Sequence, residues 1–177
     1  MPPAQAFATK LNEQIANEFA AHQQYVACAV YYDAEALPQL ARFFYRQALE
    51  ERGHALMMVQ FLLDTGAEVT TPGVAAPNSR FANATEPIAL ALQQEQRVSE
   101  QINKLAATAR EAGDYTSEQF MQWFIKEQVE EVATMGELLR VAERSSANPA
   151  AIEEYLAREH PGDEGTDPTA PQAAGSN

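Results

Sequence analysis

The chain has 177 residues, of which 25 are acidic and 12 are lysine or arginine, so its formal net charge at pH 7 is −13. This length allows one domain with a sizeable core. An acidic charge of this size disfavours nucleic acid or an anionic membrane surface as a partner, and it suits a soluble protein that attracts cations. We therefore expect no nucleic-acid partner and no membrane partner.

The number of cysteines and the amino-terminal residues indicate in which cellular compartment the protein is expected. Cys28 is the only cysteine, which excludes an intrachain disulfide and a four-cysteine metal site. The first residues do not combine a basic start with an apolar core, and no apolar run reaches the length that a bilayer requires. A cytoplasmic location is the resulting expectation.

Apolar residues recur at helical spacing in four long segments, and a fifth, shorter segment follows them. The segments are expected at residues 5–33, 38–65, 85–112, 117–144 and 149–160. Pro38 and Pro87 suit the first turns of helices. Thr85 and Asn148 are expected to cap helices, and Gly66 is expected to end one. The sequence thus predicts an all-α protein without strands.

A long stretch without periodicity, from Ala67 to about Thr85, separates the second and third helices, and it holds the turn signals Pro72-Gly73 and Pro77-Asn78. In a compact helical domain, such a connection suggests a crossover that runs the length of a bundle. The predicted fold is a four-helix bundle with one long crossover and a short fifth helix. Residues 1–160 are expected to form this domain. Residues 161–177, rich in Gly, Pro, Asp, Ala and Ser, are expected to form a flexible tail.

Each of the four long segments carries one glutamate on its apolar face: Glu18, Glu51, Glu95 and Glu131. Glu18 and Glu51 lie roughly 24 and 20 Å from the turn that joins the first two helices. Glu95 and Glu131 lie roughly 26 and 23 Å from the turn that joins the third and fourth helices. All four carboxylates can therefore meet near the middle of one bundle. Without cations they would repel one another and take up protons, and a divalent or trivalent metal removes this conflict.

His54 lies three residues after Glu51, within reach on the same helix face. Taken alone, this Glu-x-x-His stretch fits either a metal site or a helix that merely borders the core at Glu51. The four core-facing glutamates favour the metal site, and oxygen-rich ligation with one imidazole suits iron or manganese better than structural zinc. One glutamate per helix together with Glu-x-x-His is typical of di-iron carboxylate bundles.

The combined motifs resemble those of the bacterial non-haem ferritins over about residues 5–160. The matching stretches are Asn17-Glu18-Phe19 with Tyr25, Glu50-Glu51-Arg52-Gly53-His54-Ala55, Glu95, and the run from Gln122 to Glu131. The resemblance implies a ferroxidase that forms a 24-subunit hollow cage, oxidises ferrous iron with dioxygen and stores the ferric mineral inside. Iron at a di-iron centre is the implied cofactor.

The same resemblance implies a role for each matched residue. The implied ligands are Glu18, Glu51 and His54 for the first iron, and Glu51, Glu95 and Glu131 for the second. Gln128 matches a glutamine that contacts the metal ligands rather than the metal itself. Tyr25 matches a tyrosine beside the centre that is thought to take part in electron transfer. A core tyrosine that orients a glutamate through its hydroxyl is a second interpretation of Tyr25, and both can hold together.

Further acidic residues match outlying iron sites of the family. Glu50, Glu127 and Glu130 match the carboxylates of a third iron site on the way to the cavity, although a solvated acidic face is the ordinary alternative. Glu118 matches one lining position of the threefold channels that admit ferrous ions. Met121 stands at a second lining position that is acidic in vertebrate cages.

Departures from related families narrow the assignment. Bacterioferritins bind haem through a methionine directly after the bridging glutamate, and Arg52 occupies that place, so no haem is predicted. They also carry a second Glu-x-x-His, where this chain has Glu127-x-x-Glu130. Mini-ferritins lack a short fifth helix after the fourth. His22 is expected to be a hydrogen-bonded histidine rather than a ligand, and His160 a charge at a helix end.

Two other functions stay open at this point. The first is a non-catalytic iron-binding shell protein, whose acidic interior only nucleates mineral. The second is a small di-iron carboxylate oxidase that acts on an organic substrate. The presence of every implied ligand speaks against the first, and the size of the particle would distinguish the second.

Overall fold

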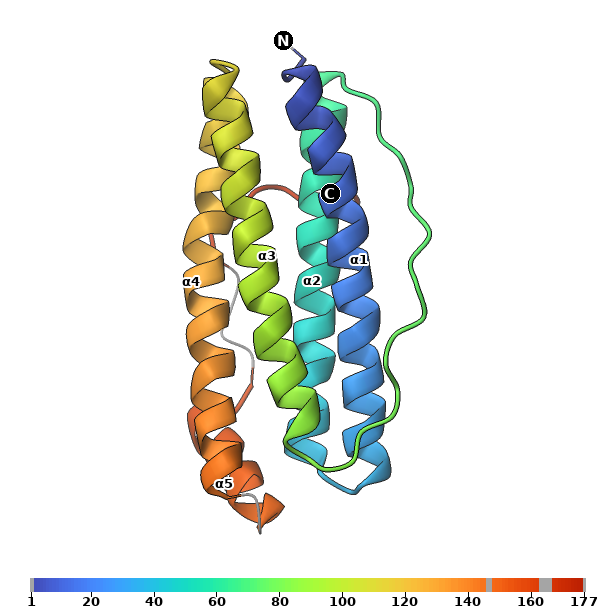
Figure 1. Ribbon diagram of the computed structural model, residues 1–177, viewed down its shortest axis with the longest axis vertical. Helices are drawn as coiled ribbons and strands as arrows, with labels where there is room; N and C mark the ends of the chain where they lie inside the picture. Colours follow the sequence, from blue (N-terminus) through green and yellow to red (C-terminus); the bar gives the residue numbers. More distant parts are fainter. Residues whose placement is uncertain (1, 146–147, 163–166, 177) are drawn as a thin grey trace.

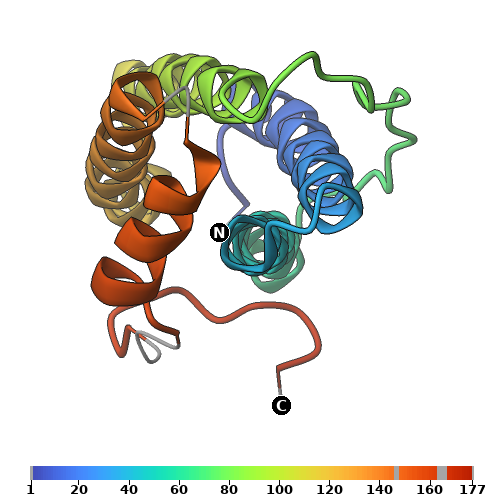
Figure 2. The same cartoon turned by 90° about the horizontal axis from the view of Figure 1, so that it is seen from below.

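A computed structural model describes residues 2–145, 148–162 and 167–176, and within them the protein is helical and contains no strand. The helices are α1 (Gln5–Ala34), α2 (Pro38–Thr65), α3 (Glu86–Glu111), α4 (Tyr115–Arg144) and α5 (Pro149–Glu159). α1 packs along α2 and α3 along α4, and α5 lies at the end of the bundle where α4 ends (Figures 1 and 2). The predicted four-helix bundle with a short fifth helix is confirmed.

The connection from α2 to α3 runs the length of the bundle beside α1, so α2 and α3 point in the same direction (Figure 1). Asn12 holds its first part, because its Nδ2 donates to the Glu68 carbonyl at 2.9 Å and its Oδ1 accepts from the Thr70 N–H at 2.7 Å. Gln24 exchanges two hydrogen bonds with the backbone of Asn78, at 2.8 and 2.9 Å. The predicted crossover is thus tied to α1 at two points.

The ends of α2 and the starts of α3 and α5 lie where the sequence signals place them, but the hydrogen bonds at those starts differ from the expected ones. Gly66 ends α2 in the left-handed region, with φ of 73°. Thr85 and Asn148 occupy the N-cap positions of α3 and α5, as predicted, but neither side chain makes a capping hydrogen bond. At the start of α3, Asn83 Oδ1 accepts instead from the N–H groups of Thr85 and Glu86, at 2.9 and 3.1 Å. An asparagine side chain readily accepts from backbone groups two residues ahead.

The core consists of two hydrophobic clusters separated by a polar layer. One cluster lies towards the α1–α2 turn and includes Tyr25, Tyr32, Phe44, Ile88 and Met135. The other lies towards the opposite end and includes Phe7, Leu11, Met58, Ile102 and Met121. Between them lie the buried polar residues Glu18, Glu51, His54, Glu95, Gln128 and Glu131. The two clusters therefore fix the four helices on either side of this layer.

The described carboxyl-terminal residues return to the bundle on the face that α2 and α4 share (Figures 1 and 2). Asp167 Oδ2 accepts a hydrogen bond from Trp123 Nε1 at 3.1 Å and lies 3.7 Å from Lys126 Nζ. The Ala174 N–H donates to the Leu56 carbonyl at 3.0 Å. These contacts join the end of the chain to both α4 and α2.

The predicted division into a domain, 1–160, and a flexible tail, 161–177, stays a prediction. Within it, residues 1, 146–147, 163–166 and 177 lie outside the described residues. Among the described helices, none is both long and apolar enough to cross a membrane.

Candidate metal centre

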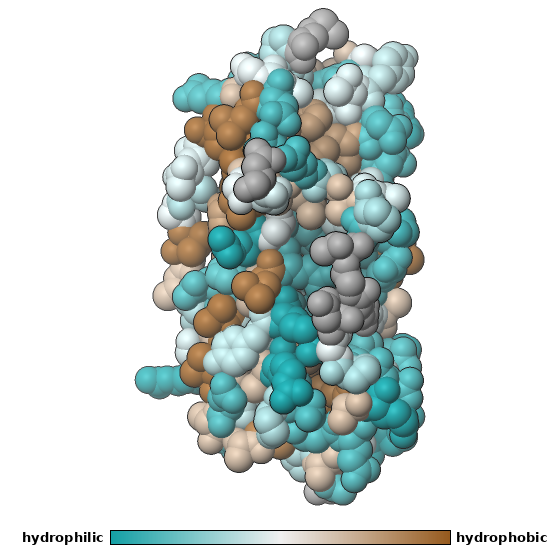
Figure 3. Space-filling model, turned by 180° about the vertical axis from the view of Figure 1, so that it is seen from behind, coloured by the Kyte–Doolittle hydropathy of each residue, from teal (hydrophilic) through white to brown (hydrophobic). Residues whose placement is uncertain are grey.

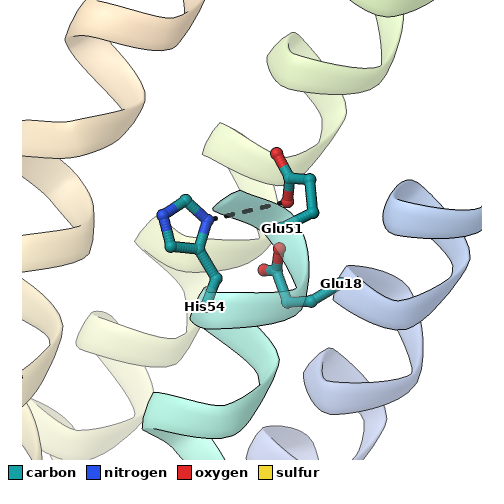
Figure 4. A group of neighbouring side chains, drawn as sticks. All are labelled: Glu18, Glu51 and His54. Atoms are coloured by element: carbon teal, nitrogen blue, oxygen red, sulfur yellow. Dashed lines mark ion pairs between the residues drawn. The ribbon is translucent and has the colours of Figure 1, made fainter. Parts of the chain in front are cut away.

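Glu18 on α1 and the pair Glu51 and His54 on α2 form one compact group in the polar layer (Figure 4). Each offers a ligand atom, and the three atoms lie within 4.8 Å of one another. His54 Nδ1 is 3.6 Å from Glu51 Oε2. All three side chains are buried, with relative exposures of 1%, 1% and 3%. The helical spacing of three residues places Glu51 and His54 on one face, and the α1–α2 packing brings Glu18 to them.

Three carboxylate oxygens in this group lack a donor among the described residues. They are Glu18 Oε2 and both oxygens of Glu51. A buried carboxylate without a hydrogen bond is costly, and such a group calls for a cation or a shared proton. Two carboxylates with one imidazole form a donor set that suits iron. The residues present therefore fit the metal that the sequence implied.

Glu95 on α3 faces the same layer but is already hydrogen-bonded at both oxygens. The Tyr25 hydroxyl donates to Glu95 Oε1. Gln128 Nε2 donates to Glu95 Oε2 at 3.1 Å and also lies within hydrogen-bonding distance of Ser99 Oγ, at 3.3 Å. Tyr25 and Gln128 thus both hold this carboxylate, in the way the second interpretation of Tyr25 requires.

A second acidic group adjoins the first and consists of Glu50, Glu127 and Glu131, whose ligand atoms also lie within 4.8 Å of one another. Glu131 is buried, Glu127 is half-buried and Glu50 is exposed. Gln47 Nε2 donates to Glu50 Oε2 at 2.7 Å. The structure does not bring Glu130 into this group. Glu130 is instead 64% exposed and lies 3.7 Å from Lys126 Nζ.

Burial and mutual repulsion shift the pKa values of the buried glutamates upwards. The pKa of Glu51 is raised well above its usual value, first by burial and then by the charges of Glu95 and Glu18. Burial also raises the pKa of Glu131 well above its usual value, followed by the charge of Glu50. Burial raises the pKa of Glu95 as well, against the lowering effect of the hydrogen bonds from Tyr25 and Gln128. Without a metal, the layer therefore tends to hold protons.

Aromatic rings enclose His54 on the side of α4. The ring of Trp123 lies 5.7 Å from the imidazole and that of Phe124 lies 5.8 Å away, both edge-on. His22 makes a contact of 2.6 Å from Nδ1 to the Ala48 carbonyl oxygen, in line with its prediction as a hydrogen-bonded histidine. Arg52, at the place where bacterioferritins carry methionine, is exposed.

The two residues considered for a channel lie near the start of α4 and differ in environment. Glu118 Oε1 accepts from Arg110 Nε at 2.8 Å and lies 2.6 Å from Arg110 Nη2. Its side chain is only 17% exposed. Met121 is fully buried in the core. His160 ends α5, and its ring packs 5.8 Å from that of Phe43.

Sequence reasoning identified Gln128 but overlooked two other glutamines that donate to carboxylates, Gln14 and Gln47. Gln14 Nε2 donates to Glu18 Oε1 at 2.7 Å, and Gln47 Nε2 donates to Glu50 Oε2 at the same distance. The spacing of four residues from Gln14 to Glu18 was a usable signal, because side chains at this spacing meet on a helix. The contact of Asp167 with Trp123 carried no such signal.

Comparisons with known proteins identify the family of this chain. Residues 8–145 match the ferritin family, described as a ferritin-like domain. Ferritin BfrB of Mycolicibacterium smegmatis is 53% identical over 169 residues, which cover 96% of this chain and 93% of that protein. The bacterial non-heme ferritin of Staphylococcus aureus is 36% identical over 141 residues, or 77% of this chain and 85% of that protein. An open pore ferritin from Archaeoglobus fulgidus has a TM-score of 0.84 at 25% identity, covering 88% of this chain and 98% of that one. The chain therefore belongs to the ferritin family.

Proposed function

We propose that this ferritin is a ferroxidase that oxidises ferrous iron with dioxygen within each subunit and stores the ferric product as mineral inside a homo-oligomeric cage. The observation that carries the proposal is the set of unsatisfied oxygens on Glu18 and Glu51 beside His54 in a buried layer. Ferrous iron and dioxygen are the substrates. Two ferrous ions each lose one electron, and dioxygen accepts the pair.

The proposed centre takes two irons. Glu18, Glu51 and His54 bind the first, and Glu51 bridges to a second that Glu95 and Glu131 complete. The two free oxygens of Glu51 support its role as the bridge. Carboxylate charge favours the ferric product over the ferrous substrate, because the cation gains charge on oxidation. Arg52, which stands where bacterioferritins carry the haem-binding methionine, supports an assignment without haem.

Roles for the surrounding residues follow from their contacts. Tyr25, bonded to Glu95, lies where it can pass an electron to the centre. Gln128 fixes the orientation of Glu95. Both are proposed to act in catalysis together with the ligands.

A third iron site on the way to the cavity is proposed at Glu50 and Glu127, with Glu130 or Glu131 as the remaining ligand. The grouping of Glu50, Glu127 and Glu131 supports the second choice. Glu118 is proposed to line an entry channel, where its ion pair with Arg110 offsets part of its attraction for ferrous ions. A 24-subunit assembly and a cytoplasmic location complete the proposal.

Replacement of the bridge tests the ferroxidase assignment. Glu51→Ala removes two ligand oxygens and should abolish rapid oxidation of the first few irons per subunit, while the particle stays assembled. Anaerobic ferrous loading followed by a pulse of dioxygen measures the oxidation, and electron microscopy measures the particle. Glu100→Ala, at an exposed glutamate on α3, is the matched control. Oxidation at the wild-type rate in Glu51→Ala would instead favour a shell that only nucleates mineral.

A further inference from the structure

Gln14 is a buried amide on α1 to which the proposed oxidation assigns no role. Its side chain is only 2% exposed, and its Nε2 donates to Glu18 Oε1 at 2.7 Å. Asn17 Nδ2 in turn donates to Gln14 Oε1 at 3.1 Å. Because Asn17 holds the amide oxygen of Gln14, the amide NH₂ group faces Glu18. The three side chains form a directed chain of hydrogen bonds on one helix face.

The buried glutamates differ in how many oxygens remain open to a cation. Gln14 occupies one oxygen of Glu18 and leaves Oε2 without a donor among the described residues. Glu51 receives no donor at either oxygen. Glu95 accepts a hydrogen bond at both. The hydrogen-bonding partners thus distinguish a ligand with one open oxygen from one with two.

We infer that Gln14, oriented by Asn17, is a positioning residue that presents Glu18 to the metal through Oε2 alone. A hydrogen bond from an amide restrains the rotation of a carboxylate. It also stabilises the negative charge on the oxygen that accepts it, which makes that oxygen a weaker metal ligand. Without this donor, Glu18 is free to turn and to bind through both oxygens. The inference rests on the proposed function, because it requires a metal at Glu18.

The test is a titration of the full-length, metal-free protein with Co²⁺ under anaerobic conditions. Co²⁺ is not oxidised in the absence of dioxygen, so binding is measured without a reaction. Its visible absorption reports the ligand set and the coordination number. Gln14→Leu removes the donor and retains most of the side-chain volume. The first Co²⁺ should bind about tenfold more weakly, in line with the loss of outer partners of metal ligands. Its absorption spectrum should also change, since Glu18 gains a second free oxygen, whereas the second Co²⁺ should bind as in the wild type.

Asn17→Leu distinguishes an effect of the orientation of the Gln14 amide from an effect of side-chain packing at Gln14. It leaves the Gln14 donor present but frees the amide to turn, so the same binding step should weaken by a smaller factor. The double variant should bind no more weakly than Gln14→Leu alone, because Asn17 acts only through Gln14. Asn17 is half-buried, so this variant remains available if Gln14→Leu does not assemble. Gln24→Leu, which removes an α1 amide bonded to the crossover instead, is the matched control.

Two kinds of result would overturn the inference, and they are distinguishable. Wild-type affinity and spectrum in Gln14→Leu, or additive effects of Gln14 and Asn17, would exclude the positioning role while leaving the metal centre in place. Failure of the wild-type protein to bind Co²⁺, or unchanged binding in Glu18→Ala and Glu51→Ala, would overturn the proposed centre and the positioning role together.

Discussion

At the scale of single residues, Glu51 shows how a buried site can lower the stability of the metal-free protein. Its carboxylate lies between two hydrophobic clusters and receives no hydrogen bond from a described residue. A charge buried in this way costs stability unless a partner or a proton neutralises it. Metal binding supplies that partner. The same feature that supports the proposed bridging role of Glu51 therefore makes the metal-free protein less stable.

Glu51→Gln should therefore stabilise the metal-free protein at pH 7. The amide keeps the shape of the side chain but carries no charge to repel Glu18 and Glu95. We expect a gain of at least about 1 kcal/mol, since one pKa unit corresponds to about 1.4 kcal/mol. Thermal unfolding of the metal-free proteins measures it, with the exposed Glu100→Gln as the control. A lower unfolding midpoint in Glu51→Gln than in the wild type would contradict this expectation.

The gain should also depend on pH, with a definite sign. Burial raises the pKa values of Glu51, Glu95 and Glu131 in the folded protein. A carboxyl with a raised folded pKa contributes stability below its unfolded pKa of about 4.3, and this contribution is lost as pH rises through the folded value. The advantage of Glu51→Gln over the wild type should therefore grow as pH rises from the ordinary glutamate pKa. A constant difference would show that Glu51 does not titrate in this way.

Which site residues the sequence could identify depends on how local their geometry is. Glu51 and His54 share one helix, so their spacing alone indicates that they meet. The membership of Glu131 rather than Glu130 in the second acidic group depends on the rotation of α4 against α2. Adjacent residues point about 100° apart on a helix, so a modest rotation decides between them.

At the scale of elements, the crossover depends on side chains of α1 for its attachment. Asn12 makes two hydrogen bonds to it, at 2.7 and 2.9 Å. Asn12→Ala should lower the free energy of unfolding by about 1–3 kcal/mol, because each of these two bonds contributes about 0.5–1.5 kcal/mol. It should also speed proteolysis between α2 and α3, which limited digestion followed by mass spectrometry measures.

The oxidation rate should stay unchanged in Asn12→Ala, because Asn12 lies outside the polar layer. Asn103→Ala, at an exposed asparagine on α3, is the matched control. Equal proteolysis of both variants would show that Asn12 does not hold the crossover.

Elements with strong apolar periodicity were predictable, and the details of their ends were not. The second helix was expected at 38–65 and is observed as Pro38–Thr65, because Pro38 and Gly66 mark its ends by backbone geometry. Thr85 is the N-cap of α3 as expected, but Asn83 rather than Thr85 accepts the backbone hydrogen bonds there, since capping depends on which nearby side chain the loop presents. The return of Asp167 to Trp123 joins residues 44 positions apart, and no local pattern encodes it.

At the scale of the whole molecule, the acidic charge bears on how ferrous iron arrives. Hydrophilic side chains run along the middle of the face opposite to that of Figure 1 (Figure 3). With a formal charge of −13 per chain, each subunit attracts cations over a distance that salt shortens. This attraction concerns delivery of iron rather than its oxidation.

The initial oxidation rate at limiting ferrous iron should therefore fall with ionic strength. We expect a decrease on the order of tenfold from about 0.01 to about 1 M salt, over which the Debye length shrinks from about 30 to about 3 Å. Stopped-flow absorbance measures it. When ferrous iron is bound first and uncharged dioxygen is then added, the rate should not depend on salt. Equal salt dependence in both orders of mixing would place the effect in the centre itself.

The position of Trp123 has a practical consequence, because it is the only tryptophan of the chain. Its ring lies 5.7 Å from His54, and its N–H donates to Asp167 near the end of the chain. Each chain therefore carries one indole fluorophore between the proposed first metal position and the carboxyl-terminal residues. Its emission intensity can report a paramagnetic ion at His54, while its emission wavelength can report the contact with Asp167. Because the chain has no second tryptophan, the whole indole emission comes from this one position.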